Sequence, residues 1–199
     1  MGAIVYLVYG DDERFHLELT FSMASALKFM KDDPAGIRIV LVCDEANARP
    51  DLGVEHIIIS KDEIRSWQFE GQYNHAIKPH VVQHALHRLQ EKVAFVDTDT
   101  FFIAHPKSMF DRIGKGRTLL CSEEATLAED PEKKWIKTTE TTSELLGRYP
   151  ISLSTRMNNS GVIGIDPADA ALLVDVIGVM RELRSIDSVF TAEQLAATI

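Results

Sequence analysis

Two carboxylates follow directly on four apolar residues in the segment Val93-Ala-Phe-Val-Asp97-Thr98-Asp99. A short apolar run of this kind is typical of a strand buried in a sheet. Residues two apart in an extended chain point to the same side, so Asp97 and Asp99 should converge where the strand leaves the sheet. Open α/β sheets bind their ligands at the carboxyl ends of their parallel strands. The segment therefore predicts a central buried strand that ends in a polar site.

Neighbouring carboxylates repel one another unless a cation lies between them. Mg²⁺ takes one or two protein carboxylates and completes its shell with water and phosphate oxygens. A metal ion held by Asp97 and Asp99 can neutralise charge that develops on a diphosphate leaving group. An Asp-x-Asp tripeptide also occurs in turns and at solvated edges, so a structural role stays open. The apolar strand before the pair and Phe101-Phe102 after it favour the metal site.

Outward from this segment, short apolar runs alternate with longer amphipathic runs, which is typical of βαβ units around a largely parallel sheet. A helix is expected from about Arg14 to Lys31, another over about 74–90, and a third after Asp166-Pro167, where the carboxylate can cap the helix. The first helix has apolar residues at helical spacing on one side, namely Leu17, Phe21, Met23, Ala24, Leu27 and Met30. Strands are expected over 3–9, 37–42, 56–59, 93–96, 118–121 and 161–165.

The chain has 199 residues, with 21 Lys and Arg against 30 Asp and Glu, so its formal net charge is −9. An acidic surface repels the phosphates of nucleic acids and of anionic lipids, so we expect no nucleic-acid partner. The hydrophobic content of 45% is close to the globular average, and the length suits one domain, 1–199, that buries a core without disulfides. The polar stretch 122–155 is longer than most connections, which indicates a functional loop or a small subdomain.

The apolar run over 3–9 is too short to span a membrane and lacks the basic start and cleavage site of a signal peptide. Cys43 and Cys121 each lie beside an apolar run, so we interpret both as small core residues in a reducing compartment. We therefore expect a cytoplasmic protein without a transmembrane segment. The sequence stops at Ile199 inside a predicted helix, so we expect the native domain to continue, and peripheral attachment to a membrane through that missing part stays open.

With these elements the sequence resembles the GT-A fold glycosyltransferases, and most closely glycosyltransferase family 8, which includes glycogenin and bacterial lipopolysaccharide galactosyl- and glucosyltransferases. The Asp-x-Asp motif is weakly specific alone, but its combination with Asn159-Ser160-Gly161 is fairly specific. The resemblance implies an α/β fold with a Rossmann-like, mostly parallel central sheet flanked by helices. Four segments carry it, in order along almost the whole chain: strand 3–9 with Gly10-Asp11, Tyr73-Asn-His-Ala-Ile-Lys78-Pro79, Phe95-Val-Asp97-Thr98-Asp99, and Met157-Asn-Asn159-Ser160-Gly161-Val-Ile-Gly-Ile165.

The resemblance implies a metal-dependent hexosyltransferase that uses a nucleotide-diphosphate sugar, expected to be a UDP-sugar, and Mn²⁺ or Mg²⁺. It makes Asp97 and Asp99 metal ligands, with Asp97 also near the ribose, and it places Thr98 among the donor-binding residues. Gly10 and Asp11 match the nucleoside pocket in this comparison. The match at Lys78, which would reach the diphosphate or the nucleoside, is less secure.

On the sugar side, the resemblance implies that Asn159 and Ser160 contact the donor sugar or the acceptor, which would be a glycan or another hydroxyl compound. Glu193 would bind a sugar hydroxyl, and Gln194 would stabilise the oxocarbenium-like centre. Transfer is expected to retain the anomeric configuration, although no residue settles how. The chain departs from the family in two ways. It stops before the C-terminal segment that supplies a third metal ligand, a role for which His105 is wrongly placed, and Glu193 stands where Asp is more usual.

Other functions remain open as alternatives. A sugar-nucleotide pyrophosphorylase would need a Gly-rich basic loop after the first strand, whereas this chain has the acidic run Gly10-Asp-Asp-Glu-Arg14. A phosphatase of the haloacid dehalogenase type would need Thr or Val at the position of Phe101. A non-catalytic binding domain with the same fold is the third alternative, and the missing third metal ligand favours it.

Several further side chains have both a functional and a structural interpretation. His80, His84 and His87 lie at helical spacing, with His75 nearby, and could bind Zn²⁺, but we prefer a polar or packing helix face. Trp67 and Trp135 lie in predicted polar loops, where an aromatic ring can stack on a sugar or cover local core. The run Thr138–Thr142 is interpreted as a solvated loop rather than a lid.

Overall fold

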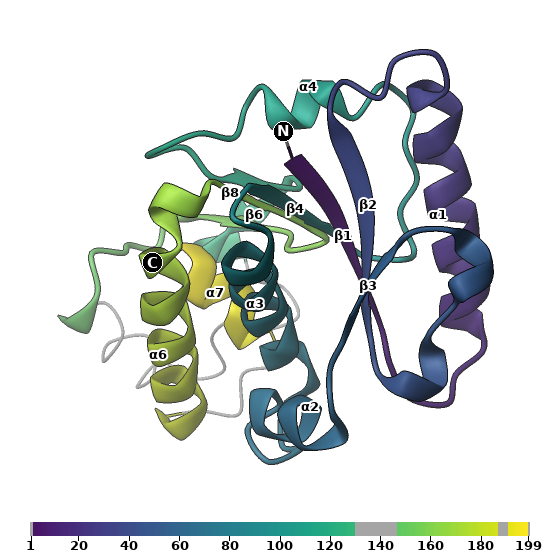
Figure 1. Ribbon diagram of the computed structural model, residues 1–199. Helices are drawn as coiled ribbons and strands as arrows, with labels where there is room; N and C mark the ends of the chain where they lie inside the picture. The colour runs from purple at the N-terminus through teal and green to yellow at the C-terminus, as the bar shows by residue number, and fades with distance from the viewer. Residues whose placement is uncertain (1, 130–146, 187–190, 199) are drawn as a thin grey trace.

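The computed structural model describes residues 2–129, 147–186 and 191–198. Its centre is a six-stranded sheet in the order β3-β2-β1-β4-β8-β5 (Figure 1). The first four strands in this order are parallel, and β8 runs antiparallel to both of its neighbours. The mostly parallel sheet that the sequence predicts is thereby confirmed. The strands are β1 (Gly2–Val8), β2 (Ile37–Cys43), β3 (Glu55–Ile58), β4 (Lys92–Val96), β5 (Leu119–Leu120) and β8 (Val162–Ile165).

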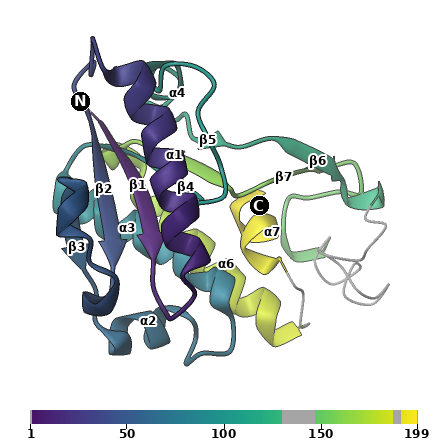
Figure 2. The same ribbon diagram turned by 90° about the vertical axis from the view of Figure 1, so that its right-hand side faces the viewer.

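Helices cover both faces of the sheet (Figures 1 and 2). One face packs against α1 and α4, and the other packs against α3 and α6. A 3-10 turn, η3 (Asn74–Ala76), leads into α3, so the predicted helix over 74–90 is confirmed with a tighter first turn. The helices are α1 (Arg14–Met30), α2 (Lys61–Trp67), α3 (Ile77–Leu89), α4 (Lys107–Phe110), α6 (Ala171–Ile186) and α7 (Ala192–Thr198).

The central strands are apolar at successive positions because both of their faces are covered. Along β1, Ala3 and Val5 belong to the core on the α3 side, whereas Ile4 and Tyr6 belong to the core on the α1 side. All four apolar residues of the run 93–96 in β4 are at most 2% exposed, as the sequence predicts for a buried strand. This strand therefore holds the residues that follow it at a fixed place on the sheet edge.

The predicted apolar side of α1 is wrong in part. Met23 and Met30 face the sheet, but Leu17, Phe21 and Leu27 are 74%, 64% and 48% exposed. Apolar residues occur all around this helix, so periodicity alone cannot choose the buried side. The choice is made by packing against β1, whose Tyr6 hydroxyl shares a 2.8 Å hydrogen bond with Ser22 Oγ. Ala24 is also exposed, and the sheet-facing residues are Leu19, Ser22, Met23, Ala26 and Met30.

The polar stretch 122–155 is not entirely a loop. Its first part forms β6 (Glu123–Thr126), which pairs antiparallel with β7 (Arg156–Asn158) in a separate two-stranded sheet (Figure 2). Met157 of β7 packs in a third apolar cluster with Tyr73, Met180 and Leu195. The predictions for Trp135 and for the run Thr138–Thr142 fall outside the described residues.

Two smaller predictions need correction. Cys43 is buried as expected, and burial raises the pKa of its thiol to about 11, but Cys121 is exposed because β5 ends before it. Trp67 ends helix α2 rather than lying in a loop.

Among the described residues, no helix is both long and apolar enough to cross a bilayer.

Candidate functional site

The carboxyl ends of β1 and β4 border a cavity of about 590 Å³. These two strands pair in parallel, so the loops that follow them emerge at the same edge of the sheet. The lining includes Gly10 and Asp11 from the loop after β1, and Lys78 from α3. It also includes Asp97, Thr98 and Asp99 from the end of β4. The residues predicted to bind the nucleotide and the metal therefore share one cavity, which we call the donor-side cavity.

The loop after β1 is fixed by side chains from the end of β2. Gly10 has a φ of 82°, a conformation that favours glycine. Its N–H donates to Asp44 Oδ2 at 3.3 Å, and its carbonyl accepts from Asn47 Nδ2 at 2.9 Å. Asp44 and Asn47 are themselves hydrogen-bonded and buried. Neither residue was predicted from the sequence, although Asp44 directly follows an apolar strand, as Asp97 does.

Asp97 forms an ion pair with Lys78 of α3. Lys78 Nζ and Asp97 Oδ2 are 2.6 Å apart, and the two side chains are only 16% and 27% exposed. Burial raises the pKa of Asp97, the charge of Asp99 raises it further, and the Lys78 ammonium opposes the rise. Asp99 is exposed to solvent at the cavity rim. The binding of a metal ion between the two carboxylates stays a prediction.

Thr98 connects the motif to α1. Its hydroxyl donates to Glu18 Oε2 at 2.9 Å, and the residue is buried. Glu18 also lines the donor-side cavity. Glu18 was not identified from the sequence, because its contact with Thr98 spans 80 positions and leaves no local pattern. Thr98 therefore anchors the strand end.

The turn Asn159-Ser160-Gly161 lies beside Asp97. The Asp97 N–H donates to the Gly161 carbonyl at 2.8 Å. A Cβ atom on Gly161 would lie 2.8 Å from Asn159 Oδ1 and 3.5 Å from Asp97 Oδ2, so a side chain at this position would force the Asn159 amide to shift. Asn159 Oδ1 accepts from the Gly161 N–H at 2.7 Å, and Asn159 Nδ2 donates to Glu124 Oε1 at 2.7 Å. The turn is therefore held against the end of β4, with Glu124 as a partner that the sequence did not predict.

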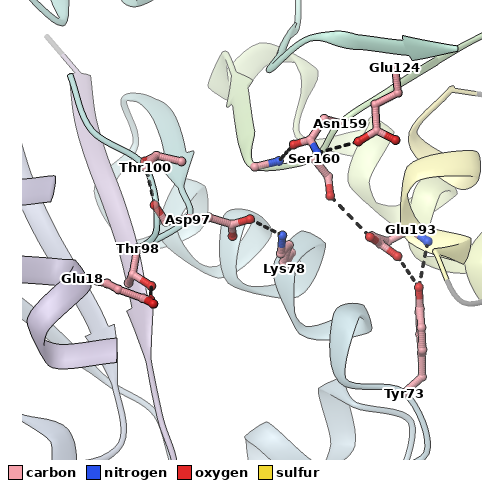
Figure 3. Close-up of polar contacts among 11 residues, drawn as sticks. Glu18, Tyr73, Lys78, Asp97, Thr98, Thr100, Glu124, Asn159, Ser160 and Glu193 are labelled. Atoms are coloured by element: carbon pink, nitrogen blue, oxygen red, sulfur yellow. Dashed lines mark hydrogen bonds and ion pairs between the residues drawn. The ribbon is translucent and has the colours of Figure 1, made fainter. Parts of the chain in front are cut away.

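Ser160 and Glu193 form a second, buried group with Tyr73, which we call the sugar-side cluster (Figure 3). The Tyr73 hydroxyl donates to Glu193 Oε2, and the Ser160 hydroxyl donates to Glu193 Oε1 at 3.4 Å. Glu193 and Gln194, at the start of α7, are only 4% and 7% exposed. Among the described residues, Ser160 and Glu193 line a neighbouring cavity of about 430 Å³ rather than the donor-side cavity. The predicted site is thus divided between two adjacent groups.

Of the three histidines in α3, His80 and His84 pack against Trp67, whereas His87 is exposed. The rings of His80 and Trp67 are parallel, with centroids 5.8 Å apart, and His84 lies 5.4 Å from the same indole. Burial lowers the pKa of His80 to about 4. Within residues 2–129, 147–186 and 191–198, no group of three His, Cys, Asp or Glu side chains could hold a metal ion. The preferred interpretation of this face as a packing surface agrees with these contacts.

The sequence matches no family model and no curated protein. Solved structures with a similar fold include the galactosyltransferase LgtC in complex with donor and acceptor sugar analogs, at a TM-score of 0.61 and 14% identity. That match covers 99% of this chain and 70% of the other. Mouse xyloside xylosyltransferase 1 in its apo form gives a TM-score of 0.58 at 11% identity, over 100% of this chain and 81% of the other. The protein therefore has the GT-A fold of these two glycosyltransferases.

Proposed function

We propose that this protein is a metal-dependent glycosyltransferase that moves a sugar from a nucleotide-diphosphate donor, expected to be a UDP-sugar, to a hydroxyl group of a glycan or a similar acceptor. The observation that carries the proposal is the single cavity at the carboxyl ends of β1 and β4 that collects Gly10, Asp97 and Asp99. The fold supports it, because both structures compared above are sugar transferases. Retention of the anomeric configuration belongs to the same proposal.

The charge of the donor-side cavity supports a need for a cation. Arg14 and Lys78 also line it, but Arg14 pairs with Asp12 at 2.6 Å and Lys78 pairs with Asp97. A diphosphate entering this space would meet an excess of negative charge and would be repelled. A divalent cation removes that repulsion. The carboxylates that line the cavity are Asp11, Asp12, Glu18, Asp97 and Asp99.

Asp97 and Asp99 are the residues that would hold Mn²⁺ or Mg²⁺, because both supply the hard oxygen ligands that these ions prefer and both line the same cavity. When bound, the ion would neutralise charge on the diphosphate. Lys78 would add a positive charge next to the same phosphates. Asp97 would also lie near the ribose.

The remaining residues would orient the donor and the acceptor. The backbone of Gly10 and Asp11, held by Asp44, would border the nucleoside. Asn159 and Ser160 would contact the donor sugar or the acceptor. Glu193 would accept a hydrogen bond from a sugar hydroxyl, and Gln194 would place its amide beside the developing positive charge at the anomeric carbon. These roles follow the resemblance residue by residue.

Calorimetry with UDP, with and without Mn²⁺, tests the proposal. Asp99→Ala should weaken Mn²⁺-dependent UDP binding by roughly tenfold or more, equivalent to about 1.4 kcal/mol. Asp111→Ala is the matched control, because Asp111 is an exposed carboxylate paired with Lys107 and does not line the cavity. Binding of UDP that is independent of metal, or unchanged in Asp99→Ala, would refute the proposal.

A donor-binding protein without transfer activity is the second candidate. It is favoured by the absence, within the described ranges, of a third His, Cys, Asp or Glu that completes a metal group with Asp97 and Asp99. Hydrolysis of several sugar nucleotides in the presence of Mn²⁺ separates the two. Donor binding without hydrolysis or transfer supports the binding protein. A pyrophosphorylase is disfavoured by the acidic loop after β1, and exchange of pyrophosphate into a nucleoside triphosphate would revive it.

A further inference from the structure

Helix α7 reaches the site through a contact between residues 120 positions apart. Glu193, in the first turn of α7, meets Tyr73, which lies just before η3 and α3 (Figure 3). Both residues are buried, at 6% and 4% exposure for Tyr73 and Glu193. A buried carboxylate needs hydrogen-bond donors, because its desolvation is costly. The positions of the groups that donate hydrogen bonds to Glu193 therefore determine where its carboxylate oxygens lie.

The hydrogen bonds between the two residues have a fixed direction. The Glu193 backbone N–H donates to the Tyr73 hydroxyl oxygen at 3.3 Å, and the Tyr73 O–H donates to Glu193 Oε2. A hydroxyl has one proton to donate, so Tyr73 gives it to this carboxylate. Tyr73 consequently holds both the backbone and the side chain of one residue.

The Tyr73 ring is itself held in place. The Arg184 guanidinium of α6 lies 4.8 Å from the ring centroid, and the His75 ring lies 5.6 Å away. Burial and the adjacent Glu193 carboxylate raise the pKa of the Tyr73 hydroxyl, so it stays protonated and able to donate. Tyr73 is thus a rigid donor between α6, α7 and the start of α3.

We propose that Tyr73 is a positioning residue that fixes the Glu193 carboxylate, and with it the start of α7, on the sugar side of the site. This inference rests on the proposed function. A carboxylate offers about four lone-pair positions, and Tyr73 and Ser160 occupy one on each oxygen. In the proposed function, sugar hydroxyls would donate to the remaining positions.

The direct test is Tyr73→Phe, which keeps the ring and removes the hydroxyl. The expected result is a fall of about 10- to 100-fold in kcat for transfer or donor hydrolysis, with the Kd for UDP and Mn²⁺ unchanged within about twofold. Tyr6→Phe is the matched control, because Tyr6 is also buried and hydrogen-bonded, to Ser22 on the α1 side of the sheet. It should lower stability without changing kcat. Equal kcat in Tyr73→Phe and the wild type would overturn the inference.

A double-mutant cycle separates positioning from a general loss of stability. In a Glu193→Ala background, removing the Tyr73 hydroxyl should cause no further loss of kcat, because the group on which it acts is gone. A further fall similar to that of the single Tyr73→Phe variant would mean that Tyr73 acts by another route and would overturn the inference.

Amide hydrogen exchange gives a readout that does not depend on activity. Tyr73→Phe should increase exchange at the amide of residue 193 by roughly tenfold, since that N–H loses its acceptor. If the wild-type chain processes no sugar nucleotide, the proposed function fails while this measurement still decides whether Tyr73 fixes α7. Unchanged exchange at residue 193 would show that it does not.

Discussion

The donor-side cavity and the sugar-side cluster are neighbours, but they are built differently. In the donor-side cavity, Asp97 and Asp99 follow the end of one buried strand, and Asp99 is open to solvent. In the sugar-side cluster, Glu193 is buried and held by Tyr73 and Ser160, from distant parts of the chain. Strand ends thus supply the half of the proposed site that carries the Asp-x-Asp pair, whereas the docking of α7 supplies the buried, hydrogen-bonded half. Changes in the first half should act on binding, and changes in the second should act on turnover.

The largest effect is expected for Asp97→Asn. It removes one charge of the carboxylate pair and leaves the Lys78 ammonium without its anion, so Mn²⁺-dependent UDP binding should fall by roughly 100-fold or more. Isothermal titration at fixed ionic strength measures the change. Asp111→Asn, an exposed carboxylate, serves as the control and should bind as the wild type does. An equally large loss of kcat with intact binding would break the division between the two halves.

Lys78→Met is expected to cost about 2 kcal/mol of unfolding free energy at neutral pH, because it leaves a largely buried carboxylate uncompensated. The folded-state pKa of Asp97 is already raised and should rise further without Lys78. Because this pKa is higher in the folded state than in the unfolded state, Asp97 is protonated in the folded protein at a higher pH than in the unfolded chain. The loss of stability caused by Lys78→Met should therefore shrink as the pH falls through the folded-state pKa. Urea unfolding at several pH values measures this.

Two controls accompany the Lys78 variant. Lys107→Met breaks an exposed pair with Asp111 and should change stability by less than about 0.5 kcal/mol. The double variant Lys78→Met with Asp97→Asn should regain stability at neutral pH, since neither charge of the pair is left. A penalty that stays constant from neutral to acidic pH would contradict this electrostatic account.

Gly161→Ala tests the point where the two halves touch. The added Cβ would lie 2.8 Å from Asn159 Oδ1, which is held by hydrogen bonds, so the turn must shift and about 1 kcal/mol of stability should be lost. Turnover should fall more than UDP affinity does. Gly178→Ala in α6 is the control, because a Cβ there meets nothing within 4 Å and a helical alanine should stabilise slightly. Wild-type stability and kcat in Gly161→Ala would show that the close approach is unimportant.

The smallest effect is expected on the outer face of α3, which belongs to neither half. The pKa of His80 is lowered to about 4, so the stability it contributes as a neutral ring is present above about pH 6.5 and is lost as the pH falls toward 4. His80→Phe keeps a ring beside Trp67 and should reduce this acid sensitivity by about 1 kcal/mol, measured by urea unfolding at pH 7 and pH 5. His87→Phe, at an exposed position of the same helix, should leave the acid sensitivity of stability unchanged.

The sequence predicts the parts of this molecule that depend on local pattern. Strand β4 and the two carboxylates that come after it are predicted from residues that are adjacent in the chain. The contact between Tyr73 and Glu193 leaves no such pattern, because it arises only when α7 docks beside α3. The buried side of α1 also depends on docking, since apolar residues surround the helix. Features that depend on neighbouring residues in the sequence are therefore predictable here, whereas contacts between distant segments are not.

The antiparallel strand β8 lets the chain leave and rejoin the sheet at one place. The chain departs after β4 at Asp97 and returns into β8 at Gly161, and a 2.8 Å backbone hydrogen bond joins these two residues. The excursion between them contains β5, which pairs with β8 in the same sheet, and the strands β6 and β7 of the two-stranded sheet. Because the entropy of closing a loop grows only slowly with its length, related chains could lengthen or shorten the part of this excursion beyond β5 at little thermodynamic cost. Such variation would give the proposed donor site many different surroundings for an acceptor.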